Sequence, residues 1–167
     1  MPIPPITEKD AIKIAANYYN LTTEAKKLGG DIDRNFLLTL KTDRSQSYTL
    51  KIHSLDTKRE EIEFQNAALQ YLKDFEGVPR IIPNRDGKTI FTISYKGDEY
   101  LVRMLSYLEG TLLENIIPKP PNLLRGLGAY IAKLDLALTD FEHHATRQEN
   151  THWDLSLAPL AIEPRLG

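Results

Sequence analysis

Short turns between candidate strands in the middle of the chain constrain its fold more than any other feature. The runs RIIP, TIFTISY and EYLVRML are separated by an Asp86-Gly87 turn and a Lys96-Gly97-Asp98 turn. Residues of this kind are typical of turns that join strands. Upstream, NFLLTL and YTLKI flank the polar loop TDRSQS and add a hairpin. The sequence therefore predicts an antiparallel sheet of about five strands.

Three helices are predicted around these strands. Thr7 followed by Asp10 resembles a capping box, and apolar residues at helical spacing then favour a helix over 8–19. Good helix formers predict a second helix over 57–75. A third helix is predicted over 122–144, with Asn122 as its cap. Its apolar residues recur at intervals of three and four: Leu124, Leu127, Ile131, Leu134, Leu138 and Phe141.

A proline-rich segment divides the chain. Glu109-Gly110 follows the last predicted strand, and Pro118, Pro120 and Pro121 come shortly after it. We predict an α+β chain made of a strand-rich unit over 1–108, a linker over 109–121 and the start of a helical unit over 122–167. Because the last helix has no predicted partner, we expect an uncovered apolar face and self-association through it.

Composition narrows the possible functions. Hydrophobic residues make up 41% and charged residues 26% of the chain, as in folded globular proteins. A net charge of −2 gives no general attraction to nucleic acid. No apolar run reaches the roughly eighteen residues that a membrane span needs, so a cytoplasmic protein is expected. The absence of cysteine excludes thiolate metal sites and cysteine nucleophiles.

The order of the predicted parts indicates a nucleotide site. The parts follow one another as in a kinase-type nucleotide lobe. They are the pair Gly29-Gly30, a strand with Lys51, a helix with several glutamates, and a final strand that runs into a linker. Alternation places Leu50 and Ile52 on one face of their strand and Lys51 on the other. The strand pattern alone leaves two roles open for Lys51: it could bind phosphate, or it could be an ordinary lysine that faces solvent.

A stretch near the end, THWDLSLAP, resembles the start of a kinase catalytic loop but differs at a required position. In such a loop an asparagine follows the aspartate by five residues, whereas Pro159 follows Asp154 here. His143, His144 and His152 lack the spacing of H-E-x-x-H, and we predict no metal site from them. No Walker loop, G-x-G-x-x-G or Gly-x-Ser-x-Gly is present. No catalytic residue is therefore predicted in this chain.

The string EYLVRMLSYLEG resembles the last strand and hinge of the aminoglycoside phosphotransferase-like small-molecule kinases, with the hydroxylysine kinase branch the most similar. The resemblance extends over LGGDIDRNFLL, YTLKI, EIEFQNAALQYL, GAYIAKLDLAL and WDLSLAP, and so over nearly the whole chain. It implies a protein-kinase-like N-lobe followed by the first long helix of an incomplete helical lobe.

The resemblance also implies roles for individual residues. Gly29 to Phe36, including Gly30 and Asn35, would cover the phosphates, and Lys51 would be the strand lysine with Glu63 as its helix partner. The purine edge would be bound by the backbone of the hinge, at Ser106, Tyr107 and Leu108. Asp31 and Asp33 depart from a glycine-rich pattern, and they would repel phosphates unless Mg²⁺ or Arg34 offsets their charge.

The function implied is the nucleotide-binding part of a phosphotransferase that uses ATP or GTP with Mg²⁺. The hydroxylysine branch implies GTP, and the acceptor would be hydroxylysine, another amino alcohol or an aminoglycoside. Without a catalytic aspartate loop, the front part of such a kinase is expected to be inactive alone. The alternatives are a non-catalytic nucleotide- or partner-binding module, such as a degenerate kinase, and a small α+β protein without a ligand.

Overall fold

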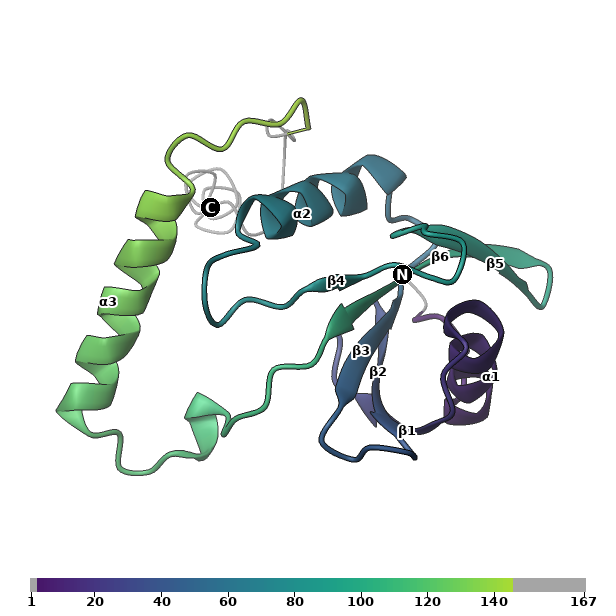
Figure 1. Ribbon diagram of the computed structural model, residues 1–167, viewed down its shortest axis with the longest axis horizontal. Helices are drawn as coiled ribbons and strands as arrows, with labels where there is room; N and C mark the ends of the chain where they lie inside the picture. The colour runs from purple at the N-terminus through teal and green to yellow at the C-terminus, as the bar shows by residue number, and fades with distance from the viewer. Residues whose placement is uncertain (1–2, 146–167) are drawn as a thin grey trace, which may run out of the picture.

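The computed structural model describes residues 3–145, which form one sheet with helices on either side and a third helix beyond it (Figure 1). The helices are α1 (Glu8–Tyr19), α2 (Arg59–Tyr71) and α3 (Pro121–Ala137), with a short 3₁₀ turn at Leu113–Asn115. The strands are β1 (Thr23–Leu28), β2 (Arg34–Leu40), β3 (Ser47–Ile52), β4 (Ile81–Ile82), β5 (Phe91–Tyr95) and β6 (Asp98–Ser106). The predicted α+β class, an antiparallel sheet with helices, is confirmed.

The sheet is antiparallel and has six strands. They pair in the order β1-β2-β3-β6-β4, and β5 pairs with the first half of β6. All five predicted strands are present, and β1 is the additional one. Its sequence TEAKKL is polar, and among its residues only Thr23 is fully buried, so it gave no alternating apolar signal. As a result Gly29 and Gly30 lie in the turn between β1 and β2, not ahead of the first strand.

The first helix agrees with its predicted bounds. The Thr7 hydroxyl accepts the Asp10 N–H, and the Asp10 carboxylate accepts the Thr7 N–H, which completes the capping box. The helix buries Ala11 and Ala15 against the sheet, in a core that it shares with buried residues of β2, β3, β5 and β6. The sheet residues of this core include Phe36, Leu38, Leu50, Ile52, Val102 and Met104.

The register of the central strands separates two faces. Leu50 pairs with Met104 and Ile52 with Val102, and all four side chains are fully buried on the α1 face. Lys51 lies between them in sequence and therefore points to the opposite face, as the alternation predicts. That second face is partly covered by α2 (Figure 1).

The other two helices are shorter than predicted. The second begins at Arg59 and ends at Tyr71, inside the expected 57–75. The third begins at Pro121, so the predicted cap Asn122 is inside the helix, where its side-chain oxygen accepts the N–H of Leu123. It ends at Ala137 because the chain turns there, and Phe141 packs instead beside Phe64 and Tyr71 of α2.

Residues 3–145 leave the apolar face of α3 largely uncovered. None of its residues is fully buried, and Leu124, Leu127 and Ile131 are exposed by 48%, 39% and 48%. Contact with the rest of the chain is made through Tyr130, whose ring packs on Phe75. Among residues 3–145, no helix has the length and apolar character needed to cross a membrane.

Candidate functional site

A pocket of about 350 Å³ opens between the glycine turn and the end of β6. Its walls come from the turn, from the Lys51 face of β3, and from the residues that follow β6. The lining residues are Leu28, Gly29, Asn35, Thr49, Lys51, Pro79, Leu105, Ser106, Tyr107 and Leu108. Six of the eight residues predicted for nucleotide binding are thus brought together. Gly30 and Glu63 are not among the lining residues.

The glycine turn is held by a side chain of the next strand. Asn35 Nδ2 donates to the Gly29 carbonyl at 3.0 Å. A Cβ at Gly30 would lie 2.6 Å from the Asp33 carbonyl oxygen, so the turn has no room for a side chain there. The other amide atom, Asn35 Oδ1, is buried and has no partner within the described residues, although it belongs to a residue that lines the pocket. The turn is therefore compact, and it contains one buried acceptor that has no partner among the described residues.

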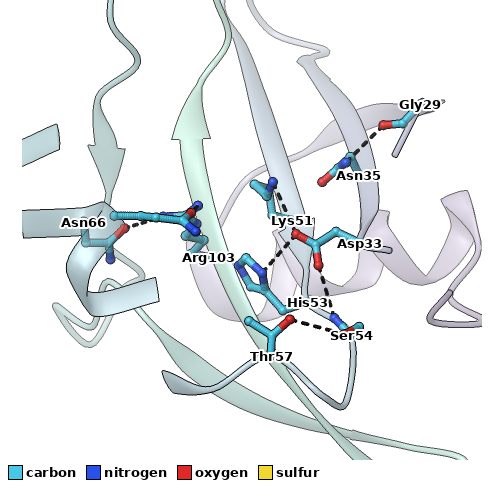
Figure 2. Close-up of polar contacts among 10 residues, drawn as sticks. Gly29, Asp33, Asn35, Lys51, His53, Ser54, Thr57, Asn66 and Arg103 are labelled. Atoms are coloured by element: carbon cyan, nitrogen blue, oxygen red, sulfur yellow. Dashed lines mark hydrogen bonds and ion pairs between the residues drawn. The ribbon is translucent and has the colours of Figure 1, made fainter. Parts of the chain in front are cut away.

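Lys51 is paired with a carboxylate from this same turn. Its Nζ lies 3.3 Å from Asp33 Oδ2, and the same oxygen lies 3.1 Å from Nδ1 of His53 (Figure 2). The second oxygen, Asp33 Oδ1, accepts the backbone N–H of Ser54 at 3.2 Å. Both carboxylate oxygens are thus occupied, and three groups fix their position.

The charges in this cluster are set by burial and by these contacts. Burial alone would raise the pKa of Asp33, but the hydrogen bond from His53 and the charges of His53 and Lys51 lower it to about 2. Burial lowers the pKa of His53 below its ordinary value of 6.5, and the charges of Arg103 and Lys51 lower it further, although the contact with Asp33 opposes this shift. At neutral pH Asp33 is therefore ionised, and a neutral His53 with its proton on Nδ1 donates to it.

Two expectations about charge compensation need correction. Lys51 contacts Asp33, and no ion pair joins it to Glu63 in the described part of the chain. A role of Glu63 toward a ligand stays a prediction. Arg34 forms no ion pair with Asp31 or Asp33 among the described residues, and its Nε donates to the Pro4 carbonyl at 3.1 Å. The charge of Asp33 is instead neutralised by Lys51 on β3. The spacing of these two residues in the sequence does not predict this pair.

The helix α2 is fastened to the sheet by a buried arginine that the sequence reading missed. Arg103 pairs in register with Lys51 and is 3% exposed. Its Nη1 donates to Asn66 Oδ1 at 2.8 Å, and Nη2 donates to Gln65 Oε1. Burial lowers the pKa of Arg103 to about 10, although the charge of Asp33 opposes this shift. An arginine in the middle of the apolar run EYLVRML was the available signal, because a buried cation needs partners.

At the hinge after β6, a side-chain hydroxyl takes the place of a backbone carbonyl as acceptor in the hydrogen-bond ladder between strands. The Ser106 N–H donates to the Arg80 carbonyl at 2.8 Å, but the returning Arg80 N–H donates to the Ser106 hydroxyl at 2.8 Å. The Ser106 carbonyl is thereby released from this ladder position. The Tyr107 N–H is taken by the Ser47 carbonyl at 3.1 Å. Among residues 3–145 the N–H of Leu108 has no backbone acceptor, so the hinge residues that line the pocket keep one unused backbone acceptor and one unused donor.

Other predicted features fall outside the site or outside the described residues. The THWDLSLAP stretch over 151–159, with His152 and Asp154, lies outside them. The rings of His143 and His144 are in contact in a tilted arrangement, with 4.2 Å between their centroids. Within residues 3–145 no group of three or more His, Cys, Asp or Glu side chains is arranged to hold a metal ion.

Comparisons with known proteins agree with this geometry. The hydroxylysine kinase of Danio rerio is 28% identical over 169 residues, which cover 94% of this chain and 46% of that protein. Among solved structures, amicoumacin kinase hAmiN in complex with AMP-PNP, Ca²⁺ and Ami has a TM-score of 0.69 at 19% identity, over 89% of this chain and 45% of that one. A microcompartment-associated aminopropanol kinase has a TM-score of 0.66 at 20% identity, over 95% and 48%.

The chain spans about half the length of the relatives it matches. Its fold is shared with small-molecule kinases, and the family model that describes the phosphotransferase enzyme family matches residues 24–164. Residues 24–164 include the glycine turn, the lysine strand, the hinge and α3. The chain therefore belongs to the phosphotransferase enzyme family, as the resemblance of its strand and hinge motifs predicted.

Proposed function

We propose that this chain binds a purine nucleoside triphosphate, ATP or GTP with Mg²⁺, as the nucleotide-binding part of a small-molecule kinase. The pocket is the observation that carries this proposal, because it has Lys51 on one wall and the hinge residues Ser106 to Leu108 on another. Its volume of about 350 Å³ lies within the range of small-ligand sites.

The charge balance next to the pocket supports an anionic ligand. Lys51 and Arg103 are opposite each other on neighbouring strands, and in the described residues Asp33 is the carboxylate that contacts this pair of cations, through Lys51. Two cations against one ionised carboxylate leave an excess positive charge. Phosphate groups would complement it at the pocket side of Lys51.

The complete reaction that we propose is phosphate transfer to an amino alcohol, with hydroxylysine as the first candidate and an aminoglycoside as the second. Family membership and the similarity to hydroxylysine kinases support this class of acceptor. Because Pro159 stands where a kinase catalytic loop needs asparagine, we expect no transfer by this chain alone. The cytoplasmic location expected from the sequence stays a prediction.

Titration calorimetry with Mg·AMP-PNP and with Mg·GMP-PNP tests the nucleotide proposal. We expect saturable binding of at least one analogue, and Lys51→Met should weaken it about ten-fold or more. Lys27→Met is the matched control, since Lys27 is exposed on β1 and lies outside the pocket lining. Failure of both analogues to bind, or equal losses in the two variants, would contradict the proposal. In parallel, hydroxylysine and an aminoglycoside should remain unphosphorylated.

A second candidate function is partner binding through α3, either to another protein or to a second copy of the chain. The exposed apolar residues Leu124, Leu127 and Ile131 support it. Gel filtration with light scattering should show self-association that Leu127→Glu reduces, with the exposed Lys133→Glu as the charge control. A monomeric wild-type chain at all concentrations would exclude self-association.

A further inference from the structure

The contacts of Lys51 distinguish the two sides of its ammonium group. Lys51 lines the pocket, whereas Asp33 is not among the lining residues. Asp33 is 14% exposed and Lys51 is 24% exposed. Asp33 therefore holds the ammonium from a side that does not contribute to the pocket wall, and the remaining N–H groups of Lys51 can donate elsewhere. An ammonium has three donors, so it can bind a carboxylate and a phosphate at once.

Asp33 is well placed to hold a flexible side chain because it is itself fixed. The Ser54 N–H binds one of its oxygens, and His53, at 3.1 Å, binds the oxygen that Lys51 also contacts. His53 is 2% exposed, so its ring has little freedom. Ser54 is in turn joined to Thr57, just before α2, at 3.2 Å between their hydroxyl oxygens (Figure 2). A long side chain such as lysine gains orientation from a partner with this support.

We infer that Asp33 is the positioning residue of Lys51, and that His53 anchors Asp33 in this role. The inference rests on the proposed nucleotide function, which it deepens by assigning the acid of the lysine–acid pair to the glycine turn and not to Glu63. The helix α2 then contributes differently: through Asn66 and Gln65 it holds Arg103, the cation opposite Lys51.

The arrangement of charges explains why an acid is needed at this position. Lys51 and Arg103 are directly opposite each other in the strand register, and such like charges repel. The groups that α2 presents to Arg103 are neutral amides. His53 is neutral at pH 7, which leaves Asp33 as the negative charge of this cluster within residues 3–145. Without it, Lys51 would turn away from Arg103 and lose its fixed direction toward the pocket.

Nucleotide binding by variants of the 167-residue chain tests this role. Asp33→Asn removes the charge at nearly constant shape, and we expect about ten-fold weaker binding of the analogue that the wild type prefers. Asp33→Glu should recover part of this loss. The matched control Glu60→Gln, an exposed acid of α2 outside the pocket lining, should change the dissociation constant less than two-fold. In the background of Lys51→Met, Asp33→Asn should cause no further loss, because both changes remove the same interaction.

A ligand without phosphates separates positioning from damage to the fold. The nucleoside of the preferred analogue uses the hinge but not Lys51, so Asp33→Asn should leave its affinity unchanged. Equal losses for nucleoside and triphosphate analogue would show a merely structural role and overturn the inference. Unchanged or tighter binding of the triphosphate analogue by Asp33→Asn would also overturn it, because Asp33 would then compete with phosphate.

The Lys51 ammonium can be followed by ¹⁵N NMR in the ligand-free chain, which keeps the two proposals distinguishable. We expect a slowly exchanging Nζ signal that Asp33→Asn abolishes and Glu63→Gln preserves. If no analogue binds the wild type, the proposed function fails, and this signal still decides whether Asp33 positions Lys51. A signal that depends on Glu63 and not on Asp33 would overturn the inference.

Discussion

The two faces of the central sheet are made by alternating residues of the same strands, yet they differ in almost every property. Leu50 is fully buried against the α1 layer, while its neighbour Lys51 lines a pocket on the opposite face. On the first face apolar side chains exclude water. On the second, charged and amide groups are paired with one another around a buried arginine. The comparison shows that strand periodicity places the apolar core on one face and the polar cluster on the other.

The largest effect is expected on the apolar face. Leu50→Ala removes a fully buried side chain and should lower the free energy of unfolding by about 3 kcal/mol, from lost transfer energy and an unfilled cavity. Urea denaturation measures it. Thr49→Ala, one residue away on the pocket face, should cost less than about 1 kcal/mol. Similar losses at the two positions would contradict the division between the faces.

A smaller loss is expected where the polar face is fully buried. Arg103→Lys keeps the charge but cannot reach both Asn66 and Gln65, so a buried cation loses partners. We expect about 2 kcal/mol of destabilisation. Arg125→Lys on the exposed surface of α3 is the control and should be nearly neutral. An unchanged unfolding midpoint in Arg103→Lys would show that the two hydrogen bonds of the guanidinium do not contribute to holding α2 on the sheet.

Acid should weaken the polar face specifically. The pKa of Asp33 is about 2 in the folded chain against an ordinary value of 3.8. A lowered pKa gives stability that is fully present above pH 3.8 and is lost as pH falls toward 2, in total about 2 kcal/mol. The difference in unfolding free energy between wild type and Asp33→Asn should therefore shrink over this range. A constant difference from pH 5 to pH 2 would contradict the assigned pKa.

The smallest effect is expected at the hinge. In Ser106→Ala the Arg80 N–H loses its hydroxyl acceptor and is expected to turn to the Ser106 carbonyl, which then becomes less available to a purine. We expect about three-fold weaker binding, a fraction of one hydrogen bond. Since the hinge contacts the base in the proposed complex, nucleoside and triphosphate analogue should lose affinity equally, unlike in Asp33→Asn. Undiminished nucleoside affinity would exclude this role of the hydroxyl.

Local signals in the sequence determined much of the fold. The capping box of Thr7 and Asp10, the alternation around Lys51 and the turns at Gly87 and Gly97 each depend on neighbours within a few residues, so they could be read directly. They fixed the first helix and five of the six strands. The polar strand β1 was missed because it is an edge strand with one fully buried residue, and its sequence shows no alternation of apolar and polar residues.

Only the tertiary structure decided how the side chains of the site pair. The choice between Asp33 and Glu63 as the partner of Lys51, and the attachment of Arg103 to Asn66, depend on strand register and on where α2 packs. The use of the Ser106 hydroxyl in place of its carbonyl depends likewise on how β4 meets β6. Sequence therefore determined which residues share a face, because that follows from backbone period. Packing decided which distant residues pair with each other. Several residues in the sequence could pair with one charged group, and only their positions in space distinguish them.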